Sequence, residues 1–260
     1  AFGQADYHGQ LGDGTTQNRS SPVQIGSSTW LSISGGTNST VGVKTDGTLW
    51  AWGRNHVKQL GLGTAGGTSH KSSPVQVGSL TTWDHVAFGE AHYFAHKTDG
   101  TLWAVGTNGY GNLGDGTTTN RSDLVQVGAE TDWTQTGGNT SIGNVRCILW
   151  KKTDGTMWGW GGNVNAQAGI LGDGTIVSKS SPVQIGARTD IVQVAMGNVV
   201  CHWLDSDGIV QVWGNNNGNG LFGDGTGGPG QGGTTSYSSP VQMGNHSPYK
   251  IVEGGRYHSL

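Results

Sequence analysis

A stretch of about 52 residues recurs along the whole chain, and this repeat limits the possible folds more than any other feature of the sequence. The tetrapeptide Ser-Pro-Val-Gln stands at residues 21–24, 73–76, 181–184 and 239–242, with a degenerate copy at 123–126. The motifs Lys-Thr-Asp-Gly-Thr and Leu-Gly-Asp-Gly-Thr recur between these copies. The chain is therefore built from about five copies of one structural unit.

Each repeat is expected to form β-strands. Residues 41–52 place two short segments on either side of Asp46-Gly47, and Asp-Gly between apolar segments is a strong hairpin signal. Apolar segments at residues 23–25 and 30–33 bring the total to about four strands per repeat, without helical periodicity. Such a unit is typical of a β-propeller blade, whereas the rival parallel β-helix has much shorter repeats.

The composition agrees with an ordered all-β protein. Glycine supplies 49 of 260 residues and only 12% of the residues are charged, which alone would also suit a disordered chain. Eleven tryptophans argue for a packed core, so we expect the glycines in turns. The net charge is −3, whereas a nucleic-acid binder is expected to carry an excess of lysine and arginine. No apolar run reaches the roughly 18 residues of a membrane span.

The repeats are expected to form one domain over residues 1–260, with units at roughly 1–41, 42–94, 95–149, 150–203 and 204–260. The first and last units are incomplete, because residues 1–3 align with residues 51–53, inside a hairpin. Either the two ends form one imperfect blade, or the chain is an internal piece of a longer protein. The second interpretation is favoured, because proteins usually avoid an unpaired strand edge.

The repeated motifs resemble a known family. Residues 36–55, followed by Gln-Leu-Gly-Asp-Gly-Thr and Ser-Pro-Val-Gln-Ile-Gly, are similar to the regulator-of-chromosome-condensation repeat, and residues 254–260 resemble its opening strand. The resemblance covers essentially the whole chain. It implies blades of four antiparallel strands in a propeller that commonly has seven. We therefore expect an all-β propeller of about five blades, or a partial arc of a seven-bladed one.

The repeated acids are predicted to serve turns rather than chemistry. A calcium loop needs six or more oxygens at one point, whereas each repeat offers one aspartate followed by the glycine of a type I′ turn. The Gly-Asp-Gly-Thr aspartates, Asp13, Asp115, Asp173 and Asp224, are predicted to bond nearby backbone N–H groups. The predicted hairpin-turn residues are Asp46, Gly47, Asp99, Gly100, Asp154, Gly155, Asp207 and Gly208.

No catalytic, metal or cofactor site is predicted. Only three glutamates occur, and no nucleophile–base arrangement or specific phosphate loop stands out. His92 and His96 would lie on one face of a strand, about 13 Å apart, which is too far for one ion. Cys147 and Cys201 are interpreted as repeat-equivalent buried thiols in neighbouring units. We therefore predict that the protein is not an enzyme.

The tryptophans fall into three sets. Two sets are predicted to lie in the core, because Phe, Val, Ile or Tyr replaces them in other repeats. These core residues are Trp52, Trp160, Trp213, Trp30, Trp83 and Trp133. The third set faces the other side of its strand, where the residues either pack between blades or are exposed to a ligand. Its members are Trp50, Trp103 and Trp158.

One repeated position carries charge without an obvious architectural role. Three residues before each proline position stand Arg19, Lys71, Arg121 and Lys179, with Tyr237 in the fifth unit. A ring of cations could bind an anionic partner or a polysaccharide. The alternative is a set of solvated charges that bond loop carbonyls. The insertions at residues 163–170 and 225–235 are further candidates for contacts unique to one unit.

The predicted function is a non-enzymatic interaction or structural scaffold whose loops bind a protein or a surface polysaccharide. The near-identical, Ser/Thr/Asn/Gly-rich copies resemble bacterial and bacteriophage members of the family, which suggests a virion component such as a tail fibre or capsid decoration, or an extracellular protein. Two alternatives stay open. One is a guanine-nucleotide-exchange or chromatin-type regulator. The other is a secreted, inhibitor-like propeller. For the location of the protein, the alternative to the virion or the extracellular space is the cytoplasm.

Overall fold

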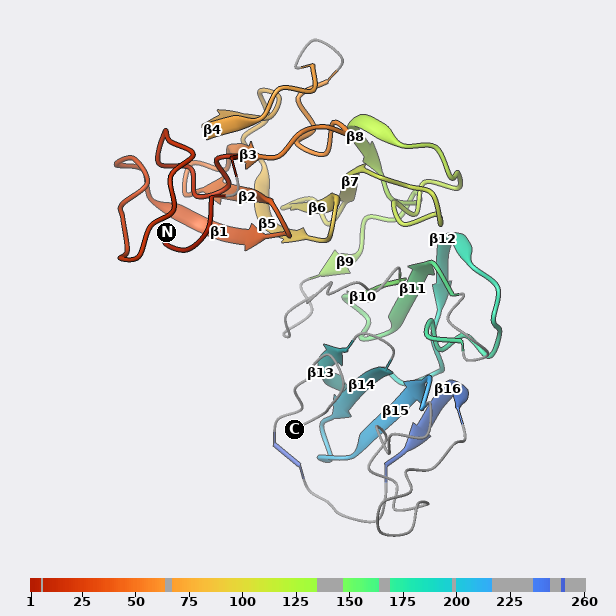
Figure 1. The fold of residues 1–260 in the computed structure, drawn as a ribbon. Helices are drawn as coiled ribbons and strands as arrows, with labels where there is room; N and C mark the ends of the chain where they lie inside the picture. Colours follow the sequence, from red (N-terminus) through yellow and green to blue (C-terminus); the bar gives the residue numbers. More distant parts are fainter. Residues whose placement is uncertain are drawn as a thin grey trace. The chain divides into compact units, whose positions relative to one another are not determined.

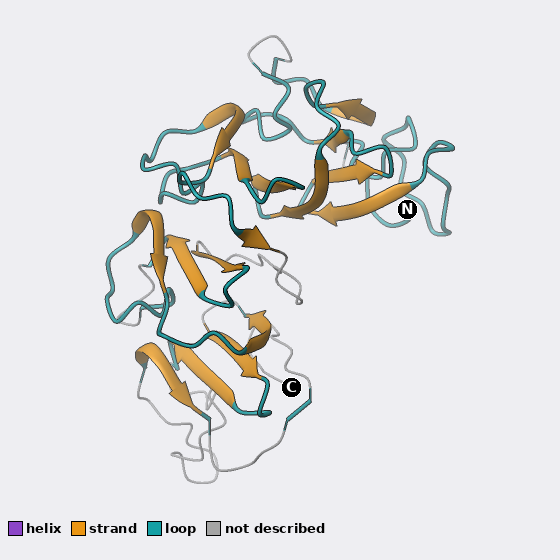
Figure 2. Cartoon of the chain, turned by 180° about the vertical axis from the view of Figure 1, so that it is seen from behind, coloured by secondary structure: helices purple, strands orange, loops and turns teal. Residues whose placement is uncertain are grey.

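The computed structural model describes residues 1–5, 7–63, 67–134, 147–163, 169–197, 200–216, 236–243 and 249–250. These residues form sixteen β-strands in four antiparallel four-stranded sheets, with no helix among them (Figures 1 and 2). In every sheet the strands lie in chain order. Each repeat therefore forms one meander, as the sequence predicts for a propeller blade.

The first two sheets, which we call blades 1 and 2, span residues 30–76 and 83–126. Blade 1 consists of β1 (Trp30–Gly35), β2 (Ser39–Lys44), β3 (Leu49–Gly53) and β4 (Lys71–Gln76). Blade 2 consists of β5 (Trp83–Phe88), β6 (His92–Lys97), β7 (Leu102–Gly106) and β8 (Arg121–Gln126). An isolated bridge between Gly3 and Arg19 precedes them.

Blades 3 and 4 span residues 133–184 and 191–242. Blade 3 consists of β9 (Trp133–Thr134), β10 (Cys147–Lys152), β11 (Met157–Gly161) and β12 (Lys179–Gln184). Blade 4 consists of β13 (Ile191–Met196), β14 (Val200–Asp205), β15 (Val210–Gly214) and β16 (Tyr237–Gln242). The chain divides into two compact units, residues 1–109 with 117–131 and residues 110–116 with 132–260.

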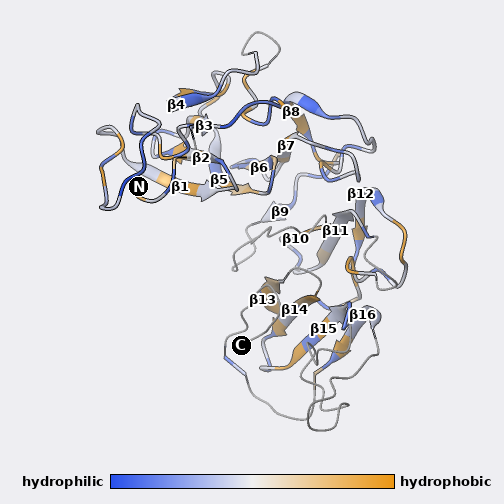
Figure 3. Ribbon diagram, viewed as in Figure 1, coloured by the Kyte–Doolittle hydropathy of each residue, from blue (hydrophilic) through white to orange (hydrophobic). Residues whose placement is uncertain are grey.

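The two middle strands of each blade supply most of the core. In β2 and β3, for example, eight of the eleven residues are buried, whereas the outer strand β4 is half-buried or exposed throughout. Strands β13 and β14 are among the more hydrophobic parts of the chain (Figure 3). Covering both faces of the middle strands requires a neighbouring layer on each side, as in stacked blades.

The core tryptophans tie blades 1, 3 and 4 to the loop that precedes each of them. The indole N–H of Trp52 donates to Gln10 O at 2.9 Å, and Trp160 and Trp213 repeat this bond to Asn112 O and Ile170 O. Burial confirms the predicted core role of these three residues. Of the second predicted set, Trp83 and Trp133 are buried, whereas Trp30 is half-buried.

The hairpin turns are not of the predicted type I′, which would give both central residues a positive φ. In the Asp46-Gly47 turn only Gly47 has a positive φ, +79°. Gly47 N donates to Lys44 O and Lys44 N to Thr48 O. The loop thus holds three residues and closes as a turn followed by a left-handed glycine. A tight Asp-Gly dipeptide fits both turn types, and the loop length decides between them.

Replacing Gly47 with alanine is expected to lower the free energy of unfolding by about 3 kcal/mol. Alanine disfavours the left-handed backbone, and its Cβ would overlap the carbonyl oxygen of Thr81. The matched control is Gly78→Ala, where φ is +64° and nothing lies within 4 Å of the new Cβ. Urea denaturation should show a loss of about 1 kcal/mol for the control. Equal losses in the two variants would contradict the close packing of this turn.

Candidate functional site

The loops that join the third and fourth strands of each blade, here called the 3–4 loops, contain most of the polar residues that the repeat shares. They span residues 54–70 in blade 1, 107–120 in blade 2, 162–178 in blade 3 and 215–236 in blade 4. Residues 4–18 form the equivalent loop between Gly3 and Arg19. The insertion at 225–235 and most of that at 163–170 lie outside the described residues.

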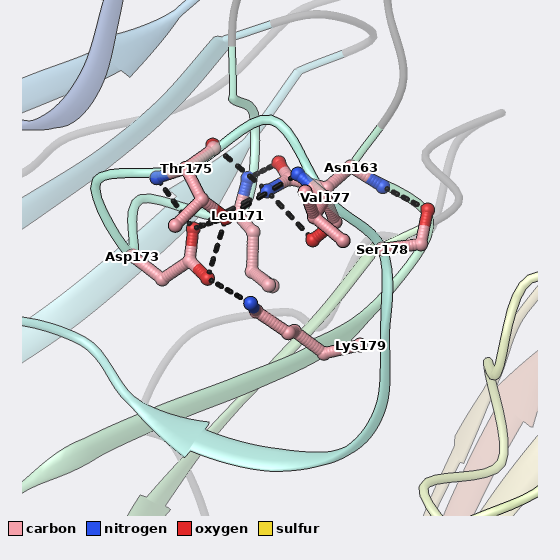
Figure 4. Close-up of polar contacts among 7 residues, drawn as sticks. All are labelled: Asn163, Leu171, Asp173, Thr175, Val177, Ser178 and Lys179. Atoms are coloured by element: carbon pink, nitrogen blue, oxygen red, sulfur yellow. Dashed lines mark hydrogen bonds and ion pairs between the residues drawn. The ribbon is translucent and has the colours of Figure 1, made fainter.

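A buried asparagine near the start of each 3–4 loop holds the loop closed. In blade 3, Asn163 is fully buried, and its Nδ2 donates to the carbonyl oxygens of Thr175 at 2.9 Å and Val177 at 3.2 Å (Figure 4). Its Oδ1 accepts from the backbone N–H of Leu171 at 2.8 Å. One side chain at the start of the loop thus satisfies backbone groups in its middle and near its end, which fixes the loop without secondary structure.

The same asparagine clamp recurs in the first unit. Asn108 Nδ2 donates to the carbonyl oxygens of Thr117 and Thr119, both at 3.1 Å. Asn55 Nδ2 donates to Gly67 O at 3.0 Å, and its Oδ1 accepts from Leu60 N at 3.1 Å. No role was predicted for these residues from the sequence. Their signal is an asparagine that stands two positions after the last glycine of the third strand in each blade.

An aspartate in the same loop supplies the second set of contacts. Asp173 Oδ1 accepts from Thr175 N at 3.0 Å and Thr175 Oγ1 at 2.8 Å, and Asp173 Oδ2 lies 3.3 Å from Lys179 Nζ (Figure 4). In the N-terminal loop, Asp13 makes the equivalent contacts with Thr15 and Arg19. Hydrogen bonds, chiefly that from Thr15, hold the pKa of Asp13 below its usual value. The predicted turn role of these aspartates is confirmed there.

The structure shows that the predicted ring residues occupy equivalent positions. Each begins the fourth strand, or its equivalent, opposite the glycine that ends the third. The pairs are Arg19–Gly3, Lys71–Gly53, Arg121–Gly106, Lys179–Gly161 and Tyr237–Gly214. The five residues are divided between the two compact units, with Arg19, Lys71 and Arg121 in the first and Lys179 and Tyr237 in the second.

Several of these cations are used inside their own loops. The Arg19 guanidinium pairs with Asp13 at 2.5 Å, and Lys179 pairs with Asp173. Arg121 Nη2 donates to Thr117 Oγ1 at 3.3 Å. These contacts lie within the loops, but the partners are aspartate and threonine side chains and not the loop carbonyls of the alternative interpretation. A ring that grips an anion stays a prediction.

A lysine in each of the first three blades covers the outward-facing tryptophan. Lys44 Nζ lies 3.4 Å from the ring centroid of Trp50 and 5.7 Å from that of Trp30. Lys97 lies 4.2 Å from Trp103, and Lys152 lies 4.4 Å from Trp158. Such cation–π contacts occupy a face of each indole ring. These tryptophans are half-buried and are poor platforms for stacking a sugar.

The hairpin-turn acids are also engaged. In blade 1, the indole N–H of Trp50 donates to Thr48 Oγ1 at 2.7 Å, and that hydroxyl donates to Asp46 Oδ1 at 2.6 Å. The Thr48 bond lowers the pKa of Asp46. The same series of hydrogen bonds, from tryptophan through threonine to aspartate, occurs at Asp99 and Asp154. In blade 4 the accepting carboxylate is that of Asp205, which bonds the N–H groups of Asp207 and Ile209.

The tip of the blade 3 loop breaks the repeat. Ile176 and Val177 are 57% and 60% exposed, and they stand where the blade 2 loop has Thr118 and Thr119. The asparagine clamp bonds the carbonyl of Val177, so an ordered backbone presents this apolar pair to solvent. The repeated motifs give no signal for this pair, because it lies between them.

The described residues contain neither a metal-ligand cluster nor a membrane-spanning helix. Among those residues, no three His, Cys, Asp or Glu side chains are grouped closely enough to hold a metal ion. Nor do the described residues include a helix long and apolar enough to cross a membrane. His96 instead pairs with Asp84, with 2.6 Å between Nδ1 and Oδ1.

The motifs match known proteins. A family model described as the regulator of chromosome condensation (RCC1) repeat matches residues 46–96 and 154–201, and a second model of that description matches residues 30–59. The ultraviolet-B receptor UVR8 of Arabidopsis thaliana is 30% identical over 199 residues, which are 74% of this chain and 43% of UVR8. The regulator of chromosome condensation of Xenopus laevis is 34% identical over 114 residues, 41% of this chain and 26% of that protein. The chain thus spans less than half the length of these relatives.

Solved structures confirm the propeller fold. Yeast RCC1 (Prp20), in its structure bound to Kap60, matches with a TM-score of 0.74 at 18% identity, over 98% of this chain and 61% of that one. Human WBSCR16 matches with a TM-score of 0.67 at 17% identity, over 98% of this chain and 78% of that one. At these identities the likeness concerns the fold alone.

Proposed function

Because the chain belongs to the regulator of chromosome condensation repeat family, we propose that it is a non-catalytic propeller that binds a protein partner through its 3–4 loops. The observation that carries this proposal is the exposed pair Ile176 and Val177 at the tip of a clamped loop. Loops held by a firm scaffold are common recognition sites in repeat proteins.

The loop geometry favours binding at low entropic cost. Asn163 and Asp173 already order the loop, so a partner would not have to order it on association. Removing the two half-exposed aliphatic side chains from water would contribute about 1 kcal/mol each. An apolar pocket on a protein suits these branched side chains better than a polysaccharide does, because sugars stack on flat aromatic rings. Lysines already cover Trp50, Trp103 and Trp158.

The absence of catalysis in the proposal rests on how the acids are used. Asp13, Asp46 and Asp173 each accept hydrogen bonds from a threonine two residues later, inside a turn or loop. Turn contacts of this kind hold each carboxylate in place within its own turn or loop. General acid–base chemistry would instead need convergent groups at one site.

The proposal is tested by giving the blade 3 loop the tip of the blade 2 loop. The variant Ile176→Thr/Val177→Thr should fold normally, because both side chains point into solvent. In chemical crosslinking of cell extracts followed by quantitative mass spectrometry, we expect it to lose a protein that the unaltered chain captures. The matched control is Thr118→Ser/Thr119→Ser, which should keep that protein. Capture of the same protein by both variants, or of a polysaccharide alone, would refute the proposal.

A second candidate function is favoured by the likeness to Prp20. A solved structure of Prp20p from Saccharomyces cerevisiae matches with a TM-score of 0.62 at 20% identity, and its description names binding to Gsp1p and histones. A regulator of nucleotide exchange or chromatin is therefore kept as an alternative. Binding of purified Gsp1p or histones by this chain would support it. The virion, extracellular and inhibitor-like assignments stay predictions from the sequence.

A further inference from the structure

The two cysteines were predicted from the sequence to be repeat-equivalent, but they do not occupy equivalent positions in their blades. Cys147 pairs with Gly161 across β10 and β11, and in blade 4 the residue at that position is Val200, opposite Gly214. Cys201 comes one residue later, opposite Trp213. Side chains alternate along a strand, so this offset places the two thiols on opposite faces of their own sheets. Cysteines of neighbouring blades can then point toward one another.

The thiols do meet between blades 3 and 4. Cys201 Sγ donates to Ile170 O at 3.5 Å, and Cys147 Sγ lies 3.9 Å from the same carbonyl oxygen. Both residues are fully buried, in one apolar cluster with Met196 and Trp213. Two sulfur atoms that share one acceptor are already neighbours, and each comes from a different sheet.

The shared carbonyl would not be left unsatisfied if the thiol protons were removed. The indole N–H of Trp213 donates to Ile170 O at 2.8 Å, which is the shortest of the three bonds to that oxygen. In blade 1 the position of Cys201 is held by Thr40, whose hydroxyl donates to Gln10 O at 2.9 Å. There a hydroxyl serves the carbonyl together with Trp52. In blade 4 the indole N–H of Trp213 alone satisfies the carbonyl of Ile170, so oxidation of the thiols would not leave this acceptor unpaired.

We propose that Cys147 and Cys201 form a reversible disulfide that links blade 3 covalently to blade 4. The oxidant is a small-molecule disulfide such as oxidised glutathione. One protein thiolate attacks it and releases one thiolate of the oxidant. The second protein thiolate then attacks the mixed disulfide and releases the other. Two protein thiols and one small disulfide thus give one protein disulfide and two small thiols, so electrons and protons balance.

Burial makes this reaction depend on opening of the interface between the two blades. The hydrogen bond with Cys147 and burial raise the pKa of Cys201 well above its ordinary value, so few thiolates form in the closed state. Once formed, the link would close a loop from residue 147 to residue 201 and restrict the unfolded chain. Oxidation should therefore lock blades 3 and 4 together, and reduction should release them.

The test uses the intact chain held with oxidised glutathione in urea below its unfolding midpoint, then quenched with acid. Intact mass should fall by two hydrogen atoms, and peptide mapping should recover residues 147 and 201 in one linked pair. The melting temperature of the oxidised chain should exceed that of the reduced chain by about 5–10 °C. A reductant should reverse both changes.

The controls are Cys147→Ala and Cys201→Ala, which should show no rise in melting temperature after the same treatment. The proposal is overturned if glutathione adducts or intermolecular dimers are the main products. It is also overturned if both thiols still titrate as free after a time in which the urea-unfolded chain is fully oxidised. Because the mass and peptide readouts come from the unaltered chain, the test stands even if a variant folds poorly.

Discussion

Lowering the pH from 6.5 to 4 is expected to cost the protein about 3 kcal/mol of unfolding free energy for each of two buried histidines. His92 and His202 are 4% and 1% exposed, and burial lowers the pKa of each from 6.5 to about 4. In this window the unfolded chain binds protons that the folded chain does not. Stability therefore falls as the pH falls, and these two residues add little further loss once the pH is below about 4.

Urea denaturation at several pH values measures this effect. Between pH 6.5 and 5 most carboxylates stay ionised in both states, so the slope there reports the histidines. The variant His92→Leu removes one of them, and its slope should be clearly shallower than that of the unaltered chain. His92 Nε2 is buried without a hydrogen-bond partner among the described residues, so leucine breaks no bond at that atom. Equal slopes for the two proteins would rule out a neutral, buried His92.

Replacing Asn163 with alanine is expected to lower the free energy of unfolding by about 3 kcal/mol. The change leaves the backbone N–H of Leu171 and the carbonyl oxygens of Thr175 and Val177 without their present partner. A buried polar group that loses its partner costs about 1–3 kcal/mol, and water can reach only the more exposed carbonyls. The loop tip should also become more mobile.

Two measurements check this prediction. Urea denaturation gives the stability loss, and hydrogen exchange gives the protection of the Leu171 amide, which should fall. The control Ile176→Ala changes an exposed side chain of the same loop and should alter stability by less than about 0.5 kcal/mol. A loss below about 1 kcal/mol for Asn163→Ala, with Leu171 still protected, would show that the clamp does not hold the loop.

The fold could be predicted from the repeat because each copy carries its own strands and turns. The Asp-Gly pairs mark the hairpins between β2 and β3 and between β6 and β7 correctly, since any turn type there joins the same strands. The turn type itself was wrong, because a three-residue loop with one left-handed glycine also fits the dipeptide. The predicted equivalence of the two cysteines was wrong for a similar reason. Similar flanking residues hid a shift of one position, which reverses the face of a strand.

The site could be predicted less well, because its contacts join residues that are not adjacent in sequence. The equivalence of Arg19 and Lys179 was predicted correctly. Their aspartate partners, Asp13 and Asp173, were not predicted. The signal was available, since Asp13 and Asp173 stand six residues before the two cations. The role of Asn163 was harder to predict, because it depends on where the loop folds back over the side chain.

The central claim is that repeated residues build the scaffold, whereas the pair that breaks the repeat binds a partner. The most direct test is the dissociation constant of the captured partner protein, measured for the unaltered chain and for Ile176→Thr/Val177→Thr. We predict binding weaker by about 10-fold or more, because two aliphatic side chains at about 1 kcal/mol each are lost. The melting temperature should be unchanged within about 1 °C, since both residues are exposed. An unchanged dissociation constant would contradict the claim.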